Sequence, residues 1–414
     1  MKLEYKHYKV KQEIQEYIKP QIIYIPLENK NGVNYKHLVK QGEYVFKGDV
    51  VAIDKSTDFP LHSSISGYAI IGTKKLMKNG KKIKCVVVEN DFKEKYREKN
   101  GSKIHLDKHT KEEFIYLLKK SGITGLSGSD VPTFLKYETS KKIDYLIVNG
   151  VECEPNVECD KAIVNSYPEE ILECVDSIIN IMKLKKAYIV LNENNLKGID
   201  KLKKYIGTYP NIELRIMDDY YPSGWDKNII YSLFGKTYKK ESSEIGMIVS
   251  NISTIYAIYE LLKYNRPLTE RIITITGEGI KKPVNVKVKI GALLSEIIEN
   301  IEGYKNIKNP LFIAGGPMSG VSVPNDELVV TKDLNCVMVI ENGNDESFPC
   351  INCGKCSAVC PVGINPVLIM KNSNNRKNLK KLKFSKCIDC RLCSYICPSK
   401  INVHESIKEV KEEV

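Results

Sequence analysis

The segment Cys350-Ile-Asn-Cys353-Gly-Lys-Cys356-Ser-Ala-Val-Cys360-Pro361 has a counterpart in Cys387-Ile-Asp-Cys390-Arg-Leu-Cys393-Ser-Tyr-Ile-Cys397-Pro398. Both follow the pattern C-x-x-C-x-x-C-x-x-x-C-P, which supplies the thiolate ligands of two [4Fe-4S] clusters. In this arrangement the first three cysteines of a run bind one cluster and the fourth binds the other. We therefore expect one cluster on Cys350, Cys353, Cys356 and Cys397, and a second on Cys387, Cys390, Cys393 and Cys360.

A zinc site or a set of disulfides is the alternative interpretation of these cysteines. A structural zinc site needs only two C-x-x-C pairs, and it explains neither the third cysteine of each run nor the proline after the fourth. Iron–sulfur clusters exchange single electrons, so the repeat predicts an electron-transfer protein. The source and the acceptor of those electrons must be sought in the rest of the chain.

Length, charge and hydropathy limit the remaining possibilities. The 414 residues exceed one hydrophobic core, so we expect three or four domains. Residues 1–20 are too charged for a secretion signal, and no apolar run could span a bilayer. We therefore expect a cytoplasmic protein, at most peripheral on the membrane through its partners, with its other five cysteines reduced. The net charge of +12 is spread along the chain without a nucleic-acid motif, which argues against a nucleic-acid partner.

A strand-rich segment runs from about residue 21 to residue 89. The strand at 22–26 ends at Pro26, and residues 39–52 alternate short strands with turns at Gly42 and Gly48. The pattern resembles the barrel-sandwich hammerhead of biotinyl and lipoyl carriers. Those carriers modify a lysine on an exposed hairpin, and this chain has no Met-Lys-Met turn in that place. We therefore expect a scaffold without a swinging arm.

A glycine-rich loop follows the first predicted helix. Thr110 and Glu113 form a capping box that begins this helix, and Gly122 ends it. Gly125 and Gly128 come next in the loop. The backbone N–H groups of such a loop can approach a phosphate closely. A plain tight connection has the same composition, so the loop alone leaves both interpretations open.

An acidic phrase comes directly after the next predicted strand. The apolar residues 143–148 predict a buried strand, and Asn149-Gly-Val-Glu152-Cys-Glu154-Pro155 follows it. Glu152 and Glu154 either contact a ligand or form an exposed acidic turn.

The order of these motifs resembles the C subunit of the Rnf electron-transport complex, from about residue 20 to the end of the chain. The resemblance rests on the hammerhead, the glycine loop, the acidic phrase and the cysteine runs. It also rests on the phrases Tyr221-Pro-Ser-Gly224, Ile273-Thr-Ile-Thr-Gly277 and Gly315-Gly-Pro-Met-Ser-Gly320. The flavin subunit of respiratory complex I and a soluble proline reductase-associated electron-transfer protein are related to the same family.

The resemblance implies an α/β multidomain fold with four parts. It predicts a barrel-sandwich hybrid domain at 1–95 and a Rossmann-like FMN and NADH domain at 105–265. A β-grasp (SLBB-like) domain is expected at 266–330, and a two-[4Fe-4S] ferredoxin-type domain at 340–414.

The resemblance also implies cofactors and site residues. FMN can accept hydride from NADH and release electrons singly, which predicts an NADH-linked oxidoreductase that feeds the clusters and needs no catalytic acid or base. A carboxylate near the ribose would favour NADH over NADPH. The predicted cofactor-binding residues are Gly122, Gly125 and Gly128 at the flavin phosphate, and Asn149, Glu152 and Glu154 in the flavin and nicotinamide pocket.

The glycine loop departs from the family pattern, which reads G-x-G-G-A-G-F-P-T. This chain has lost two of those glycines, and it carries Ser127 and Asp130 in the loop. Side chains restrict the approach of the backbone, and an anionic Asp130 repels a phosphate unless it points away. Trp225 and Asp226 also differ from the residues of relatives. A flavin-less cluster relay or adaptor is therefore the alternative function.

The segment 371–386, between the two cysteine runs, is rich in basic residues. Such a patch would steer an acidic ferredoxin-like partner or contact anionic lipid, although a solvated helix face is the alternative. The partners that the resemblance implies are other subunits of a membrane electron-transport complex, or a soluble reductase. The basic residues are Lys371, Arg376, Lys377, Lys380, Lys381, Lys383 and Lys386.

Overall fold

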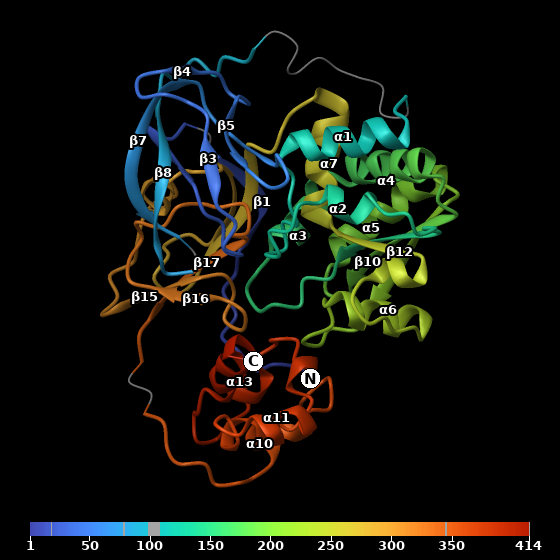
Figure 1. The fold of residues 1–414 in the computed structure, drawn as a ribbon, viewed down its shortest axis with the longest axis vertical. Coiled ribbons are helices and arrows are strands. Elements are labelled where there is room, and N and C mark those ends of the chain that lie inside the picture. Colours follow the sequence, from blue (N-terminus) through green and yellow to red (C-terminus); the bar gives the residue numbers. More distant parts are fainter. Residues whose placement is uncertain (18, 78, 98–107, 344–345, 414) are drawn as a thin grey trace.

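The structure is a computed structural model that describes residues 1–17, 19–77, 79–97, 108–343 and 346–413. Figure 1 shows a β barrel and a second β-rich domain on one side, and a helix-covered sheet on the other. A small helical lobe, which contains both chain termini in this view, lies at the lower end. The α/β multidomain arrangement expected from the sequence is confirmed.

The barrel is built from two small sheets that share one core. The first sheet has the strand order β2-β8-β7-β4, and the second has the order β3-β5-β6. Apolar side chains from both sheets, among them Ile23, Val51 and Val88, meet in this core. The strands are β2 (Ile22–Pro26), β3 (Tyr35–His37), β4 (Tyr44–Val45), β5 (Val50–Asp54), β6 (Pro60–His62), β7 (Gly67–Leu76) and β8 (Lys82–Asn90).

The N-terminal strand differs from the expected domain boundary of 1–95. The strand β1 (Lys11–Tyr17) pairs in parallel with β14 (Val284–Lys289), far along the chain, rather than with the barrel. Tyr17 is buried in the core of that second sheet. Strand pairing over so long a sequence separation leaves no local pattern, so the sequence could not place β1.

The second β-rich domain is a six-stranded sheet with the order β1-β14-β13-β17-β15-β16. It extends past the expected end at residue 330, because β17 pairs with both β13 and β15. The helix α8 packs on it through Leu294 and Ile298. The remaining elements are β13 (Glu270–Thr276), α8 (Leu294–Asn300), β15 (Pro310–Ala314), β16 (Val321–Val323) and β17 (Cys336–Glu341).

The third domain is a doubly wound parallel sheet with the strand order β11-β10-β9-β12. We call it the nucleotide domain, after the FMN and NADH domain that the sequence predicts there. The chain reverses its direction of winding between β9 and β12, and ligands bind open α/β sheets at the carboxyl ends of strands beside such a point. Helices cover both faces of the sheet. The strands are β9 (Tyr145–Gly150), β10 (Lys186–Asn192), β11 (Ile212–Met217) and β12 (Met247–Asn251).

The first helix of this domain begins and ends where the sequence predicts it. The capping box of Thr110 and Glu113 is present, and the helix ends at Gly122 in the left-handed conformation. The expected start of the domain at residue 105 lies outside the described residues. The helices are α1 (Lys111–Ser121), α2 (Phe134–Tyr137), α3 (Cys159–Ser166), α4 (Pro168–Met182), α5 (Leu196–Tyr205), α6 (Asp226–Phe234) and α7 (Ile252–Tyr264).

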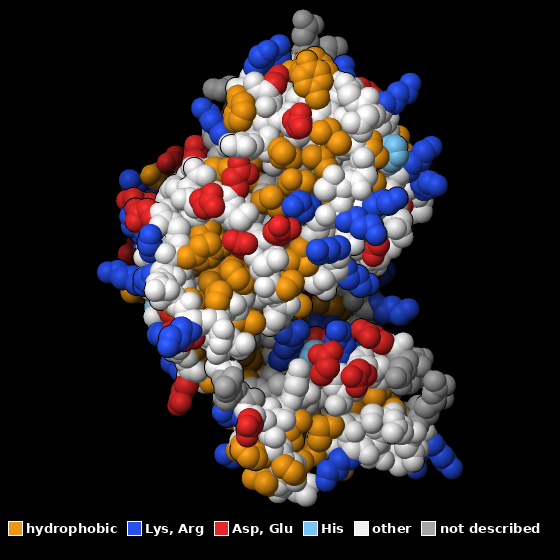
Figure 2. Space-filling view, turned by 90° about the vertical axis from the view of Figure 1, so that its left-hand side faces the viewer, with side chains coloured by type: hydrophobic (Ala, Val, Ile, Leu, Met, Phe, Trp, Pro, Cys, Tyr) orange, Lys and Arg blue, Asp and Glu red, His pale blue; other side chains and the backbone are white. Residues whose placement is uncertain are grey.

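The lower lobe repeats one short motif. In each cysteine run a residue with positive φ, Gly354 or Arg391, begins a four-residue helix that carries the third cysteine. Figure 2 shows this lobe set off from the rest of the molecule by a constriction, with hydrophobic side chains gathered near its lower end. The helices are α9 (Lys355–Ala358), α10 (Pro366–Lys371), α11 (Arg376–Lys381), α12 (Leu392–Tyr395) and α13 (Val403–Glu413). Among the described residues, no helix is long and apolar enough to cross a bilayer.

Candidate functional site: two cysteine cavities and a nucleotide-binding edge

The eight cysteines of the lower lobe converge on two small cavities. One is lined by Cys350, Cys353, Cys356 and Cys397, and the other by Cys360, Cys387, Cys390 and Cys393. The eight cysteines of these two groups form no disulfides. The structure thus brings together the two groups of four that the sequence spacing predicts. Four thiols around one cavity fit a [4Fe-4S] cluster, which takes four thiolate ligands.

The two groups differ in burial. Cys353 of the first group is exposed, whereas Cys390 and Cys393 of the second group are buried. Burial raises the pKa of Cys390 to about 11 and that of Cys393 to about 12. The positive charge of a bound metal would hold these thiols as thiolates. We call the group with Cys353 the outer group and the group with Cys390 the inner group.

Hydrogen bonds from two other domains hold the inner group in place. From the nucleotide domain, the Tyr221 hydroxyl donates to the Cys390 carbonyl at 2.9 Å, and the Trp225 indole N–H donates to the Ile388 carbonyl at 3.2 Å. From the second β-rich domain, the Gly320 carbonyl accepts from the Arg391 guanidinium at 2.6 Å. The inner group is therefore held directly against both domains.

At the end of β9, Asn149 connects the acidic phrase to the segment that contacts the inner group. Its amide donates to the Gly224 carbonyl at 2.8 Å, and its side-chain oxygen accepts from the Val151 N–H at 3.0 Å. Gly224 belongs to the same phrase as Tyr221. Asn149 thus fixes the position of the segment that reaches the cysteines.

Glu152 and Glu154 are half-buried rather than displayed on an exposed turn. The Glu152 carboxylate accepts from the Asp160 and Lys161 N–H groups, at 3.0 and 3.1 Å, in the first turn of α3. Burial, followed by the nearby Asp160, raises the pKa of Glu152 to about 8. The environment therefore favours the neutral form of this side chain.

Glu154 links the acidic phrase to the second β-rich domain. Its carboxylate accepts from the Met318 and Ser319 N–H groups, at 2.7 and 2.9 Å. A Cβ atom at Gly316 would lie only 2.2 Å from the Glu154 Cγ, so this position requires glycine. Burial raises the pKa of Glu154, and the two backbone donors act against that shift.

A cavity of about 210 Å³ opens at the carboxyl ends of β9 and β10. Its lining includes Gly150, Glu152 and Glu154 from the acidic phrase, and Lys161 from α3. The predicted Asn149 does not line it. Sequence reasoning missed Tyr5, His7, Asn192, Asn194, Asn195 and Asp219, which also line this cavity. Asn192 ends β10 and the other two asparagines follow it, and that position at the end of a buried strand was the signal available for finding them.

The predicted glycines lie in the loop that packs on α7 and on the barrel. The Leu126 N–H donates to the Thr254 hydroxyl at 3.1 Å in the first turn of α7. A Cβ atom at Gly122, where φ is +69°, would lie 2.9 Å from the Pro60 carbonyl oxygen of the barrel. Gly122, Gly125 and Gly128 do not line the cavity at β9 and β10. The structure therefore does not bring the two sets of predicted flavin residues around one cavity.

Asp130, which replaces a glycine of the family pattern, does not line the cavity at the carboxyl ends of β9 and β10, which we call the nucleotide edge. It is buried, and it lines a separate cavity with Lys332 and Asp333 of the second β-rich domain. Burial, followed by Asp333, raises its pKa to about 6. Its carboxylate is thus no obstacle to an anionic ligand at the ends of β9 and β10. The amides and carboxylates there can bind the hydroxyl groups of a flavin nucleotide, and Lys161 can bind its phosphate.

Comparisons with known families find three family models along the chain. Residues 2–93 match the RnfC barrel sandwich hybrid domain, residues 118–260 match the Nuo51 FMN-binding domain, and residues 349–401 match the 4Fe-4S dicluster domain. The chain therefore combines an FMN-binding domain with a domain for two iron–sulfur clusters.

Whole-chain comparisons find relatives that are named as the C subunit of an ion-translocating oxidoreductase complex. The protein of Pasteurella multocida is 31% identical over 355 residues, which cover 83% of this chain and 42% of that protein. The protein of Rhodobacter capsulatus is 27% identical over 373 residues, which cover 87% and 72%. This chain spans about half the length of several of these relatives.

A solved structure of a NAD⁺-reducing [NiFe]-hydrogenase in the air-oxidized state shares the fold. It superposes with a TM-score of 0.52 at 14% identity, and the match covers 74% of this chain and 62% of that one. At this identity the likeness concerns the fold alone.

Proposed function

This chain is related to the C subunits of ion-translocating oxidoreductase complexes, and from that premise we propose that it oxidises NADH and passes the electrons to a redox partner. Electrons enter at the carboxyl edge of the parallel sheet, reach the inner cluster first and leave from the outer cluster. Bound FMN supplies the conversion of a two-electron donor into single electrons, and the clusters supply the one-electron relay.

The hydrogen bonds that hold the inner group are the observation that carries this proposal. Asn149 at the end of β9 contacts Gly224, and Tyr221 of the same phrase contacts the Cys390 carbonyl. Glu154, also in the acidic phrase, contacts the segment 318–319, and Arg391 contacts Gly320 at the end of that segment. Two paths, each made of hydrogen bonds joined by a short stretch of backbone, thus connect the carboxyl end of β9 with the inner group.

The charges at the nucleotide edge support NADH rather than NADPH. Acidic residues outnumber lysines in the lining of the cavity. The acidic residues are Glu152, Glu154, Glu158 and Asp219, and the lysine is Lys161. A carboxylate can hydrogen-bond the ribose hydroxyls of NADH, but it repels the additional phosphate of NADPH. The raised pKa of Glu152 reduces the negative charge that this side chain adds.

The outer group has the surface that an electron acceptor needs. Cys353 is exposed, and the apolar side chains of Phe348, Ile351 and Leu368 are exposed in the same lobe. Lys355 and Lys371 are exposed there too, and Lys371 donates to the Asn352 side chain beside Cys353. An apolar contact surrounded by lysines suits an acidic redox protein, which these charges would steer at low salt. The partner is a ferredoxin-like protein, another subunit of a membrane complex, or a soluble reductase.

Rapid freezing after anaerobic mixing with NADH, followed by electron paramagnetic resonance of each cluster, tests the order of transfer. In Cys353→Ser, which alters the outer group, we expect NADH to reduce the inner cluster at the wild-type rate. In Cys390→Ser, which alters the inner group, reduction of the outer cluster should slow strongly. Cys85→Ser changes a buried thiol of the barrel and serves as the matched control.

The proposal is wrong if the outer cluster of Cys390→Ser is reduced by NADH as fast as in the wild type. It is also wrong if NADPH reduces the wild-type protein as readily as NADH does. A protein that binds both clusters but is reduced by neither nucleotide would be the flavin-less relay that the altered glycine loop suggests as the alternative.

A further inference from the structure

A second cavity, of about 150 Å³, lies where three domains meet. The barrel contributes Lys47, the second β-rich domain contributes Glu270 and Lys287, and α7 contributes Tyr256 and Glu260. No residue predicted to bind FMN, NADH or a cluster lines this cavity. It is therefore a site that the proposed electron transfer does not use.

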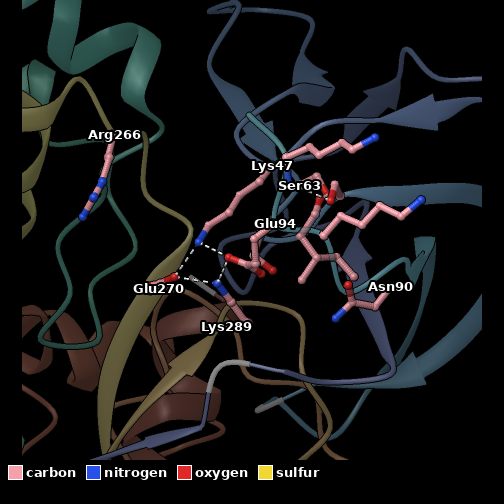
Figure 3. A network of polar contacts seen from close by, with 12 residues as sticks. Lys47, Ser63, Asn90, Glu94, Arg266, Glu270 and Lys289 are labelled. Atoms are coloured by element: carbon pink, nitrogen blue, oxygen red, sulfur yellow. Dashed lines mark hydrogen bonds and ion pairs between the residues drawn. The ribbon is translucent and has the colours of Figure 1, made fainter. Parts of the chain in front are cut away.

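Three residues of the lining, Lys47, Glu270 and Lys287, belong to a cluster of opposite charges in which the positive ones are in excess. Figure 3 shows Lys47, Glu94, Glu270 and Lys289 converging from separate segments, with Arg266 standing apart from them. Glu270 accepts from Lys289 at 2.6 Å and from Lys47 at 3.0 Å, and Glu94 pairs with the same two lysines. Lys287 also pairs with Glu270, at 3.3 Å. Three lysines therefore share two carboxylates.

Arg271 adds a charge that the described residues do not pair. Its side chain lines the cavity and is only 4% exposed. The guanidinium donates to the carbonyls of Lys332 and Leu126, its Nε–H has no partner, and no carboxylate of the described part of the chain forms an ion pair with it. Asp130, Asp160 and Asp333 act on it only from a longer range. Buried arginines are usually paired, so this one is available for an anion.

Arg266 provides a further donor at the edge of the cavity. It pairs with Glu260 at 2.9 Å, while its own Nε–H is buried without a partner. Apolar side chains, among them Leu268 and Ile272, also line the cavity, and Tyr96 and Tyr256 add aromatic surface. The cavity thus combines unused guanidinium donors with a wall that favours a hydrocarbon or aromatic group.

We propose that this cavity binds a small organic anion, with its carboxylate or phosphate on the arginines and its apolar body against the leucine and isoleucine wall. Because three domains line the site, a bound anion holds them in one arrangement. The ligand therefore stabilises the assembled form of the protein without taking part in electron transfer.

Calorimetric titration and thermal unfolding of the full chain, with its cofactors bound, test this proposal. The probes are phenyl phosphate, benzoate and inorganic phosphate. We expect at least one of the two aromatic anions to bind and raise the Tm, and inorganic phosphate, which lacks an apolar body, to bind more weakly. Comparison of phenyl phosphate with benzoate shows which anionic group the arginines prefer.

The variants Arg266→Gln and Lys287→Gln should each weaken binding about tenfold, the loss expected for one hydrogen bond to a charged group. Both positions keep some solvent contact, so these variants are expected to fold. Lys281→Gln, at an exposed lysine of the same domain, should leave binding unchanged. FMN content and the reduction by NADH should stay at the wild-type level in all three variants.

Three results would overturn the proposal. Neither aromatic anion binds at millimolar concentration, or Arg266→Gln and Lys287→Gln bind the probes as well as the wild type does. The third is that added FMN displaces the probe from flavin-free protein, because the cavity would then be part of the flavin site. If the wild-type protein binds the probe but is not reduced by NADH, the proposed function alone is wrong.

Discussion

The substitution Glu270→Gln should destabilise the junction between the barrel and the second β-rich domain by about 3 kcal/mol, near the lower end of the range for breaking a buried ion pair. The side chains of Lys47 and Lys289 are only 7% and 1% exposed, and both donate to Glu270. Without that carboxylate, Lys47 and Lys289 would share Glu94 alone, and Lys287 would lose its ion pair with Glu270. Glu94 is partly exposed and remains available, so we place the loss at the lower end.

Hydrogen–deuterium exchange of peptides from β5, β13 and β14 measures this local stability without requiring the whole chain to unfold as one unit. A loss of about 3 kcal/mol corresponds to exchange that is roughly a hundredfold faster. The double variant Glu270→Gln with Lys289→Met should recover most of the loss, because it removes one stranded charge. Glu302→Gln, which breaks an exposed pair with Lys282, should leave exchange unchanged.

The pH dependence of the same exchange follows from the lysines. They hold the pKa of Glu270 well below its ordinary value. A lowered carboxyl pKa stabilises the folded state at neutral pH, and this stabilisation is lost only as the pH falls below about 4. An effect of Glu270→Gln below about 1 kcal/mol at neutral pH, or a double variant no more stable than the single one, would refute this account of the network.

Three further predictions concern the candidate site and its surroundings. Burial raises the pKa of Asp130 to about 6, so its ionisation costs stability as the pH rises from about 4 to about 6. Asp130→Asn should therefore stabilise the protein at pH 7 by about 3 kcal/mol and abolish this loss of stability. Denaturation across pH measures both effects, and equal pH profiles of the variant and the wild type would contradict them. Trp225→Phe, which loses the hydrogen bond to the Ile388 carbonyl, should make the lower lobe more sensitive to limited proteolysis, and an unchanged cleavage rate would exclude a holding role. Cys356→Ser and Cys393→Ser should each lower the iron content by about half, and loss of all iron from either would show that the clusters do not assemble independently.

Much of the lower lobe could be predicted from the sequence because iron–sulfur ligation leaves a local signature. The third cysteine of each run and the proline after the fourth are close neighbours in the chain, and their spacing alone indicates which four thiols gather together. The structure places the same fours around two cavities. The exchange of Cys360 and Cys397 between the groups follows from the same pattern.

The roles of the acidic phrase depend on contacts that the sequence does not display. Glu152 accepts hydrogen bonds at the start of α3, and Glu154 accepts them from residues more than 160 positions away. Gly122 is required by the barrel rather than only by a turn. A motif marks such residues as special, but only the tertiary structure shows which partner each of them contacts.

The junction of the three domains was not predictable for the same reason. Lys47, Glu94, Glu270 and Lys289 belong to distant segments, and each of them is an ordinary charged residue in its local sequence. Their meeting depends on how the barrel packs against β13 and β14. The strand β1 is a similar case, because it joins a sheet whose other strands begin about 250 residues later.

Iron, acid-labile sulfide and flavin should be quantified in one anaerobically purified sample, because these cofactors are what the proposed electron transfer requires. We expect about eight irons and about eight sulfides per chain, with about one FMN. Zinc in place of iron, or about four irons, would contradict the two-cluster assignment. About eight irons without flavin would contradict the proposed oxidation of NADH and leave the chain as an electron relay.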